Sequence, residues 1–227
     1  MKLLLFDVDL TLINTAGAGR RSMTLAFEKL FGSSNGLEKV DFAGRTDRAI
    51  FKDALRFHQL SWQETIEQEF KQHYFTNLQI EIKKPHKNKR IELGVPELLN
   101  LLSARADIKL GLLTGNWREG ARIKLEHFNL QHFFTLGAYA DDAELRSELP
   151  RFAVQRLTAQ IGEEIDFKDV FIIGDTPLDV ACARPFGARS IAVATGLFNY
   201  EHLQASQPDY LFHDLSDSGK FLQIIDA

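Results

Sequence analysis

Short apolar runs alternate along most of the chain with segments in which apolar residues recur every three or four positions. The first run, over 3–6, is continuous and apolar, which is typical of a strand buried on both faces of a sheet. Similar runs predict strands over 109–114, 133–137, 169–174, 190–194 and 210–212. Helical spacing lies between them, at 118–128 and 150–161 and in a helix that starts at Pro96. Strands that alternate with helices predict an α/β fold with a doubly wound parallel sheet.

The segment between the first two strands has a different pattern, because no strand interrupts residues 16–80. An apolar stripe that ends at Gly32 predicts one helix, and a second stripe runs from Ile50 to Phe57. Ser61 to Glu64 has the pattern of a capping box that opens a third helix, with Trp62 and Phe70 interpreted as core. We therefore expect an inserted helical domain over 15–90 and a main domain formed by 1–14 and 91–227.

Composition narrows the classes of partner. The chain has 227 residues and a formal net charge of -4, so no overall positive field suggests nucleic acid as a partner. The single cysteine, Cys182, excludes an internal disulfide and suits a reducing compartment. The first apolar run is too short for a signal peptide, and no window has the length of a membrane span. These features predict a cytoplasmic protein that binds neither nucleic acid nor membrane.

Polar side chains stand where three of the predicted strands end. Asp7 and Asp9 follow the first strand, Thr114 ends the second, and Asp175 ends the strand over 169–174. Because parallel strands direct their carboxyl ends to one edge of a sheet, these groups should share a crevice. Each has a simpler explanation on its own: Thr114 could cap a helix, and Asp175 could begin a turn. Clustered carboxylates repel one another unless a cation lies between them, and oxygen ligands favour Mg²⁺.

These residues belong to four motifs that occur in order: 7–12 (DVDLTL), 114–116 (TGN), a basic residue near Arg146, and 174–179 (GDTPLD). With this set the chain resembles the haloacid dehalogenase-like hydrolases, in the branch that contains phosphoglycolate phosphatases. The helical insert is similar to the type-1 cap of that family. The resemblance implies a Rossmann-like core and an inserted cap domain that closes over the site.

The resemblance also implies a role for each motif residue. Asp7 attacks phosphorus and becomes an aspartyl phosphate, and Asp9 protonates the leaving oxygen and then activates water. The carboxylates of Asp7 and Asp175 and the backbone carbonyl of Asp9 hold Mg²⁺.

The resemblance further implies that Thr114 and the N–H group of Gly115 hold the phosphoryl oxygens, with Asn116 beside them. Asp179 is implied to support either the metal region or the basic residue from behind.

The third motif departs from the family pattern, which is a lysine followed by proline. The matching segment, over 144–150, supplies Arg146, whose guanidinium is a planar fork and not a point charge. Arg146 is the candidate for the basic residue, and the alternatives are Arg151 in that role or an ordinary surface role for Arg146. In the insert, Arg45 and Asp47 lie in a predicted turn between the first two helices. They are the candidates for substrate specificity: Arg45 could bind a carboxylate or a second phosphate, or it could be an ordinary surface arginine.

The sequence therefore predicts a magnesium-dependent phosphatase that acts on small phosphorylated metabolites, with phosphoglycolate-like compounds as candidates. One alternative is a mutase like β-phosphoglucomutase, which uses the same nucleophile together with a lysine of the cap that the sequence does not identify. A haloacid dehalogenase is another, although Asp9 and the pair Asp175 and Asp179 argue against it. A binding protein without catalysis is the third.

Overall fold

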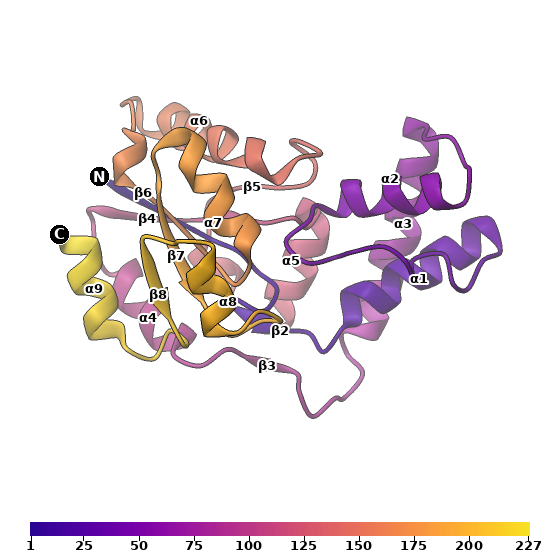
Figure 1. Cartoon of the computed structure of the whole chain (residues 1–227), viewed down its shortest axis with the longest axis horizontal. Coiled ribbons are helices and arrows are strands. Elements are labelled where there is room, and N and C mark those ends of the chain that lie inside the picture. The colour runs from indigo at the N-terminus through magenta and orange to yellow at the C-terminus, as the bar shows by residue number, and fades with distance from the viewer.

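The computed structural model describes residues 1–227 as a parallel six-stranded sheet with helices on both faces and a helical insert at one end (Figure 1). The strand order is β5-β4-β1-β6-β7-β8, and every neighbouring pair is parallel. The strands are β1 (Lys2–Phe6), β4 (Ile108–Leu113), β5 (Leu136–Ala138), β6 (Val170–Gly174), β7 (Arg189–Val193) and β8 (Tyr210–Phe212). This arrangement confirms the predicted α/β fold. Because β1 lies between β4 and β6, the three polar strand ends are neighbours.

Both faces of β1 are buried, as its apolar run predicts. Leu4 and Phe6 belong to a core that includes helices α4 and α5, whereas Leu3 and Leu5 belong to a second core with α6 and α7. The helices that cover the sheet are α4 (Val95–Ser103), α5 (Arg118–His127), α6 (Leu149–Ile161), α7 (Pro177–Ala183), α8 (Tyr200–Ala205) and α9 (Ser218–Asp226). None of the helices in the structure combines the length and the apolarity that crossing a bilayer requires.

The insert consists of α1 (Ala18–Phe31), α2 (Asp47–Phe57) and α3 (Glu64–Glu81), which lie beyond one edge of the sheet (Figure 1). Helix α1 ends at Gly32, whose φ of 71° is the left-handed conformation that the glycine stop predicts. The predicted capping box is wrong, because α3 begins at Glu64 with Gln63 as its N-cap and no side chain caps it. Ser61 precedes that cap by two residues, so it does not occupy the position from which a hydroxyl bonds the third helical N–H group.

Trp62 is not in the core. It is 44 % exposed, its indole N–H donates to Glu67 at 2.8 Å, and the ammonium of Lys52 lies 4.6 Å from its ring centre. The polar tip of an indole allows such a half-exposed position. Phe70, in contrast, is buried as predicted and stacks on Phe51 with ring centres 4.2 Å apart.

The chain passes between the two parts twice, and these two connections pair with each other. Strand β2 (Ile13–Asn14) pairs with β3 (Arg90–Ile91) in antiparallel register. The expected domain boundaries, at 14/15 and 90/91, fall on this pair and stay a prediction. Packing crosses them, because Trp117 is fully buried within the cluster of the insert, against Phe70 and Tyr74.

Trp117 should therefore contribute strongly to stability. We expect Trp117→Ala to lower the free energy of unfolding by about 3–5 kcal/mol, because it leaves a large cavity between α3 and α5. The matched control is Trp62→Ala, which removes the same side chain from the surface and should cost about 1 kcal/mol. Urea denaturation of the three proteins measures the difference, and equal losses for the two variants would contradict the interpretation.

Candidate active site

A tight turn follows β1 and brings the carboxylates of Asp7 and Asp9 to the sheet edge. The N–H groups of Leu12 and Ile13 both donate to the carbonyl of Val8 at 3.1 Å. Leu10 takes a φ of 62°, an uncommon conformation for a residue with a branched side chain. Strained backbone of this kind is often found at functional sites.

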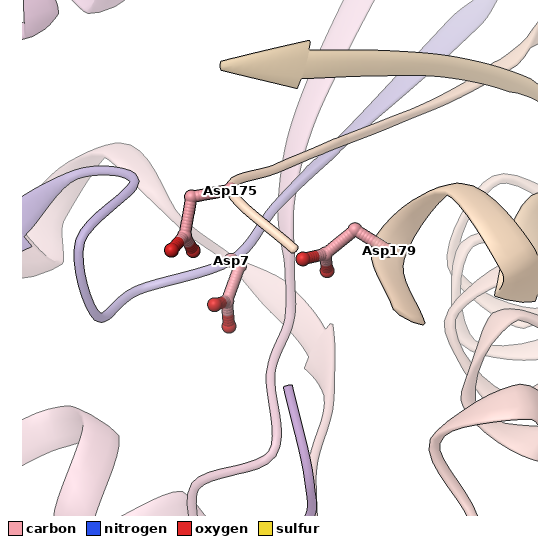
Figure 2. A group of neighbouring side chains, drawn as sticks. All are labelled: Asp7, Asp175 and Asp179. Carbon is pink, nitrogen blue, oxygen red and sulfur yellow. The ribbon is translucent and has the colours of Figure 1, made fainter. Parts of the chain in front are cut away.

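Three carboxylates gather at this edge, from the ends of β1 and β6 and from α7 (Figure 2). One oxygen from each of Asp7, Asp175 and Asp179 lies within 4.8 Å of the others, and all three residues are buried. Asp179 has both oxygens occupied, one by Arg146 and the other by the hydroxyl and N–H of Thr176, at 2.7 and 3.0 Å. Asp7 and Asp175 are thus the acids of this group with oxygens left for a ligand.

The electrostatics of the cluster are unfavourable without a further cation. Burial raises the pKa of Asp7 to about 6, although Arg146 opposes the increase. Burial, with the nearby charges of Asp179 and Asp7, also raises the pKa of Asp175 well above its ordinary value. A divalent cation beside these oxygens would offset the repulsion, so the donor set fits a hard metal ion such as Mg²⁺.

Arg146 is the arginine that reaches the cluster. Its side chain is buried, one Nη atom lies 3.2 Å from an oxygen of Asp7, and the same nitrogen bonds Asp179 and the carbonyl of Leu113. Arg151 is exposed, pairs with Glu148 at 3.3 Å and stacks on Phe152. The geometry therefore favours Arg146 over Arg151 as the basic residue of the third motif.

The end of β4 presents hydrogen-bond donors toward Asp7. The hydroxyl oxygen of Thr114 accepts from the side-chain amide of Asn116 at 2.8 Å, and this hydroxyl group lowers the pKa of the Asp7 carboxyl. The N–H of Gly115 donates to no other group. A Cβ atom on Gly115 would lie 2.1 Å from the carbonyl oxygen of Arg45, so only glycine fits there. The Asn116 side chain also donates to Asp9 at 2.8 Å.

A cavity of about 490 Å³ lies between this edge and the insert, and the motif residues line it together with residues from α1 to α3. The predicted specificity turn docks onto its rim. The backbone N–H of Asp47 donates to the carbonyl of Gly115 at 2.6 Å. The Asp47 carboxylate accepts from the backbone N–H of Trp117 at 2.9 Å. Arg45 lines the cavity as well, but its guanidinium is paired with Asp53. Substrate contact by either residue stays a prediction.

Lys124 lies on α5 and lines the cavity, although it belongs to none of the four sequence motifs. Its ammonium is 2.5 Å from a carboxylate oxygen of Asp9 and 2.5 Å from the side-chain oxygen of Asn116. A lysine within an amphipathic helix usually indicates a solvated face, so the sequence alone carries no signal of this position.

Comparison with known proteins agrees with this architecture. The family model described as haloacid dehalogenase-like hydrolase matches residues 4–193, so the chain belongs to that family. This result confirms the resemblance found in the four motifs and the assignment to a class of enzymes.

Individual relatives carry different names. A protein described as a candidate pyrophosphatase, PpaX, from Caldanaerobacter subterraneus is 26 % identical over 212 residues, covering 93 % of this chain and 90 % of its own. The crystal structure of a predicted phosphoglycolate phosphatase from Haemophilus somnus has a TM-score of 0.71 at 21 % identity and covers 98 % of both chains. A candidate β-phosphoglucomutase from Bacteroides vulgatus has a TM-score of 0.70 at 21 % identity, covering 100 % of this chain and 89 % of its own. The two solved structures show the same fold.

Asp47 gives the site a testable pH dependence. Burial raises the pKa of Asp47 to about 7, against the attraction of Lys124 and the hydrogen bond from Trp117. The unfolded chain releases this proton near pH 4, so the buried acid costs stability as the pH rises from about 4 to 7. Asp47→Asn keeps an acceptor for Trp117 and removes the charge. We expect the free energy of unfolding of Asp47→Asn, measured relative to wild type by urea denaturation, to be about 2 kcal/mol higher at pH 8 than at pH 5.

The exposed Glu163→Gln removes one negative charge from the surface and should change stability by less than about 0.5 kcal/mol at either pH. A difference between Asp47→Asn and wild type that is the same at pH 5 and pH 8 would contradict the interpretation.

Proposed function

We propose that this protein is a magnesium-dependent phosphatase that hydrolyses small phosphate monoesters through an aspartyl-phosphate intermediate, with phosphoglycolate-like compounds as candidate substrates. The observation that carries the proposal is the arrangement around Asp7. Its buried carboxylate lies 3.2 Å from Arg146 and shares one cavity with Thr114, which lowers the pKa of Asp7, and with the unpaired N–H of Gly115. Such a pocket can accept the negative oxygens of a phosphoryl group.

Asp7 and Asp175 would supply carboxylate oxygens for the metal, and the backbone carbonyl of Asp9 would be the third ligand from the chain. When bound, Mg²⁺ would neutralise the phosphoryl group and bring it against the nucleophile. Asp179 supports the site by holding Arg146, because both of its oxygens are already engaged.

In the first step, an oxygen of Asp7 attacks phosphorus while the bond from phosphorus to the leaving oxygen breaks. Asp9, in its protonated form, gives its proton to that oxygen, so the product leaves as a neutral alcohol. Thr114, Gly115 and Arg146 hold the phosphoryl oxygens, on which the charge is spread as the bonds change.

In the second step, water attacks the phosphorus of the aspartyl phosphate, and Asp9 takes a proton from that water. Inorganic phosphate leaves, Asp7 is restored as a carboxylate, and Asp9 is again protonated. One residue thus works as acid and then as base, and its carboxylate has to reach both the leaving oxygen and the water.

The size of the cavity and the docked insert favour small substrates. A volume of about 490 Å³ that is covered by the insert suits a compact metabolite. The names of PpaX and of the Haemophilus protein support a phosphate compound as substrate. The insert lines the cavity with Arg20 and Arg45 but with no lysine, which weighs against a mutase that needs a lysine of the cap.

The first test is release of p-nitrophenol from p-nitrophenyl phosphate with Mg²⁺ and with EDTA. We expect EDTA to abolish turnover, and Asp7→Asn to reduce kcat by about 10³-fold or more, because the amide cannot act as the nucleophile. Asp175→Asn should bring activity near the EDTA level at all accessible Mg²⁺ concentrations. Normal turnover by Asp7→Asn would overturn the proposed function.

The second test separates the two arginines. Arg146→Ala should lower kcat by about 10²–10³-fold, because a cation is lost beside the reacting oxygens. Arg146→Ala also breaks a buried ion pair, which costs about 3–5 kcal/mol of stability. Arg146→Lys keeps the positive charge, so it should stay folded and retain more activity than Arg146→Ala.

The control is Arg151→Ala, which should stay within about twofold of wild type because Arg151 is exposed. A large loss in Arg151→Ala together with a normal rate in Arg146→Ala and Arg146→Lys would transfer the role to Arg151.

A further inference from the structure

Lys124 is a buried cation at the active site that none of the four motifs contains. Only 4 % of its side chain is exposed, and its ammonium contacts Asp9 and Asn116, each at 2.5 Å. A buried ammonium is costly unless it is paired and hydrogen-bonded. Its place between two polar groups of the active site therefore indicates a function beyond packing.

The contacts of Asp9 show what Lys124 does. Lys124 and the amide of Asn116 both donate to the same carboxylate oxygen of Asp9, at 2.5 and 2.8 Å. The other oxygen of Asp9 has no hydrogen-bond partner in the structure, and the side chain is 36 % exposed toward the cavity. Two donors fix one oxygen and so limit the rotation of the carboxylate, which leaves the second oxygen free for a substrate.

Residues of the insert enclose the Lys124 side chain. A Cβ atom on Gly19 of α1 would lie 3.1 Å from the Lys124 ammonium nitrogen, so the glycine leaves the space that this side chain occupies. The hydroxyl of Tyr74 on α3 borders the same space. The contact between Lys124 and Asp9 is thus made beneath the docked helices α1 and α3.

We propose that Lys124 is a positioning residue for Asp9: with Asn116, its ammonium holds one oxygen of the Asp9 carboxylate so that the other faces the substrate. The inference rests on the proposed function, in which Asp9 transfers the proton in both steps. Lys124 itself touches no reacting atom in this scheme. Because Gly19 of α1 lies against the Lys124 ammonium, this one side chain links docking of the insert to the orientation of Asp9.

The experiment is a double-mutant cycle between Lys124→Met and Asp9→Asn, measured with p-nitrophenyl phosphate and Mg²⁺. Methionine has a similar length and shape but no charge and no N–H donor. We expect Lys124→Met to lower kcat by about 10–100-fold with KM within about threefold of wild type, and Asp9→Asn to lower kcat by about 10²–10⁴-fold. The double variant should be no more than about threefold slower than Asp9→Asn alone, because both changes remove the same function.

Three kinetic results would overturn the inference: a normal kcat for Lys124→Met, a rise in KM alone, which would indicate direct substrate contact, or losses that multiply in the double variant. The control is Lys168→Met, which removes one positive charge from an exposed site on the main domain and should leave kcat unchanged.

A crystal structure of Lys124→Met supplies a readout that does not depend on activity. We expect the Asp9 carboxylate to move away from Asn116, and an unmoved carboxylate would overturn the inference even if the enzyme were slow. If the wild type released no phosphate from any monoester, the proposed function would fail. The position of the Asp9 carboxylate in crystal structures of wild type and Lys124→Met would still decide whether Lys124 orients it.

Discussion

Repulsion among buried carboxylates is the constraint on which this site depends. Asp7 and Asp175 lie at the ends of adjacent strands because β1 pairs with β6, and Asp179 joins them from α7. Placing these acids together is unfavourable, as the raised pKa values of Asp7 and Asp175 indicate. Arg146 compensates for part of the charge, through Asp179 and Asp7. The remaining negative charge is one that a divalent cation would offset, and the proposed reaction uses such a cation.

The insert completes the site as well as covering it. Asp47 receives the N–H of Trp117 and donates to the carbonyl of Gly115, while Trp117 is buried among the aromatic side chains of α3. The hydroxyl of Thr46 donates to the carbonyl of Glu144, two residues before Arg146. The segment 45–47 thus contacts both the end of β4, at Gly115, and the loop that carries Arg146. The contacts that dock the insert are therefore also contacts that hold the site residues in place.

Much of this architecture could be predicted from the sequence, because it depends on local patterns. Continuous apolar runs located the main strands, and parallel pairing then brought Asp7, Thr114 and Asp175 to one edge. The errors have local causes too. Ser61 had the right spacing for a capping box but stands two residues too early, and Trp62 satisfies its indole N–H at the surface. Helix α8 is less than two turns long, too short for a periodic pattern to predict it reliably.

Other features depend on contacts between distant segments, which no local pattern contains. Lys124 is buried with Gly19 of α1 against it, and nothing in the sequence around position 124 indicates that neighbour. The choice between Arg146 and Arg151 likewise depends on where the loop before α6 lies relative to Asp7. The sequence supplied both candidates, and only the three-dimensional arrangement separates them.

The pairing of β2 with β3 ties together the two connections to the insert. Two covalent connections that were free of each other would let the helices twist and slide over the sheet in many directions. Because the two connections are bonded side by side, neither can shift along the other without breaking this pairing. The docked insert fits just as closely at its far end, where the carbonyl of Arg45 leaves no room for even a methyl group on Gly115.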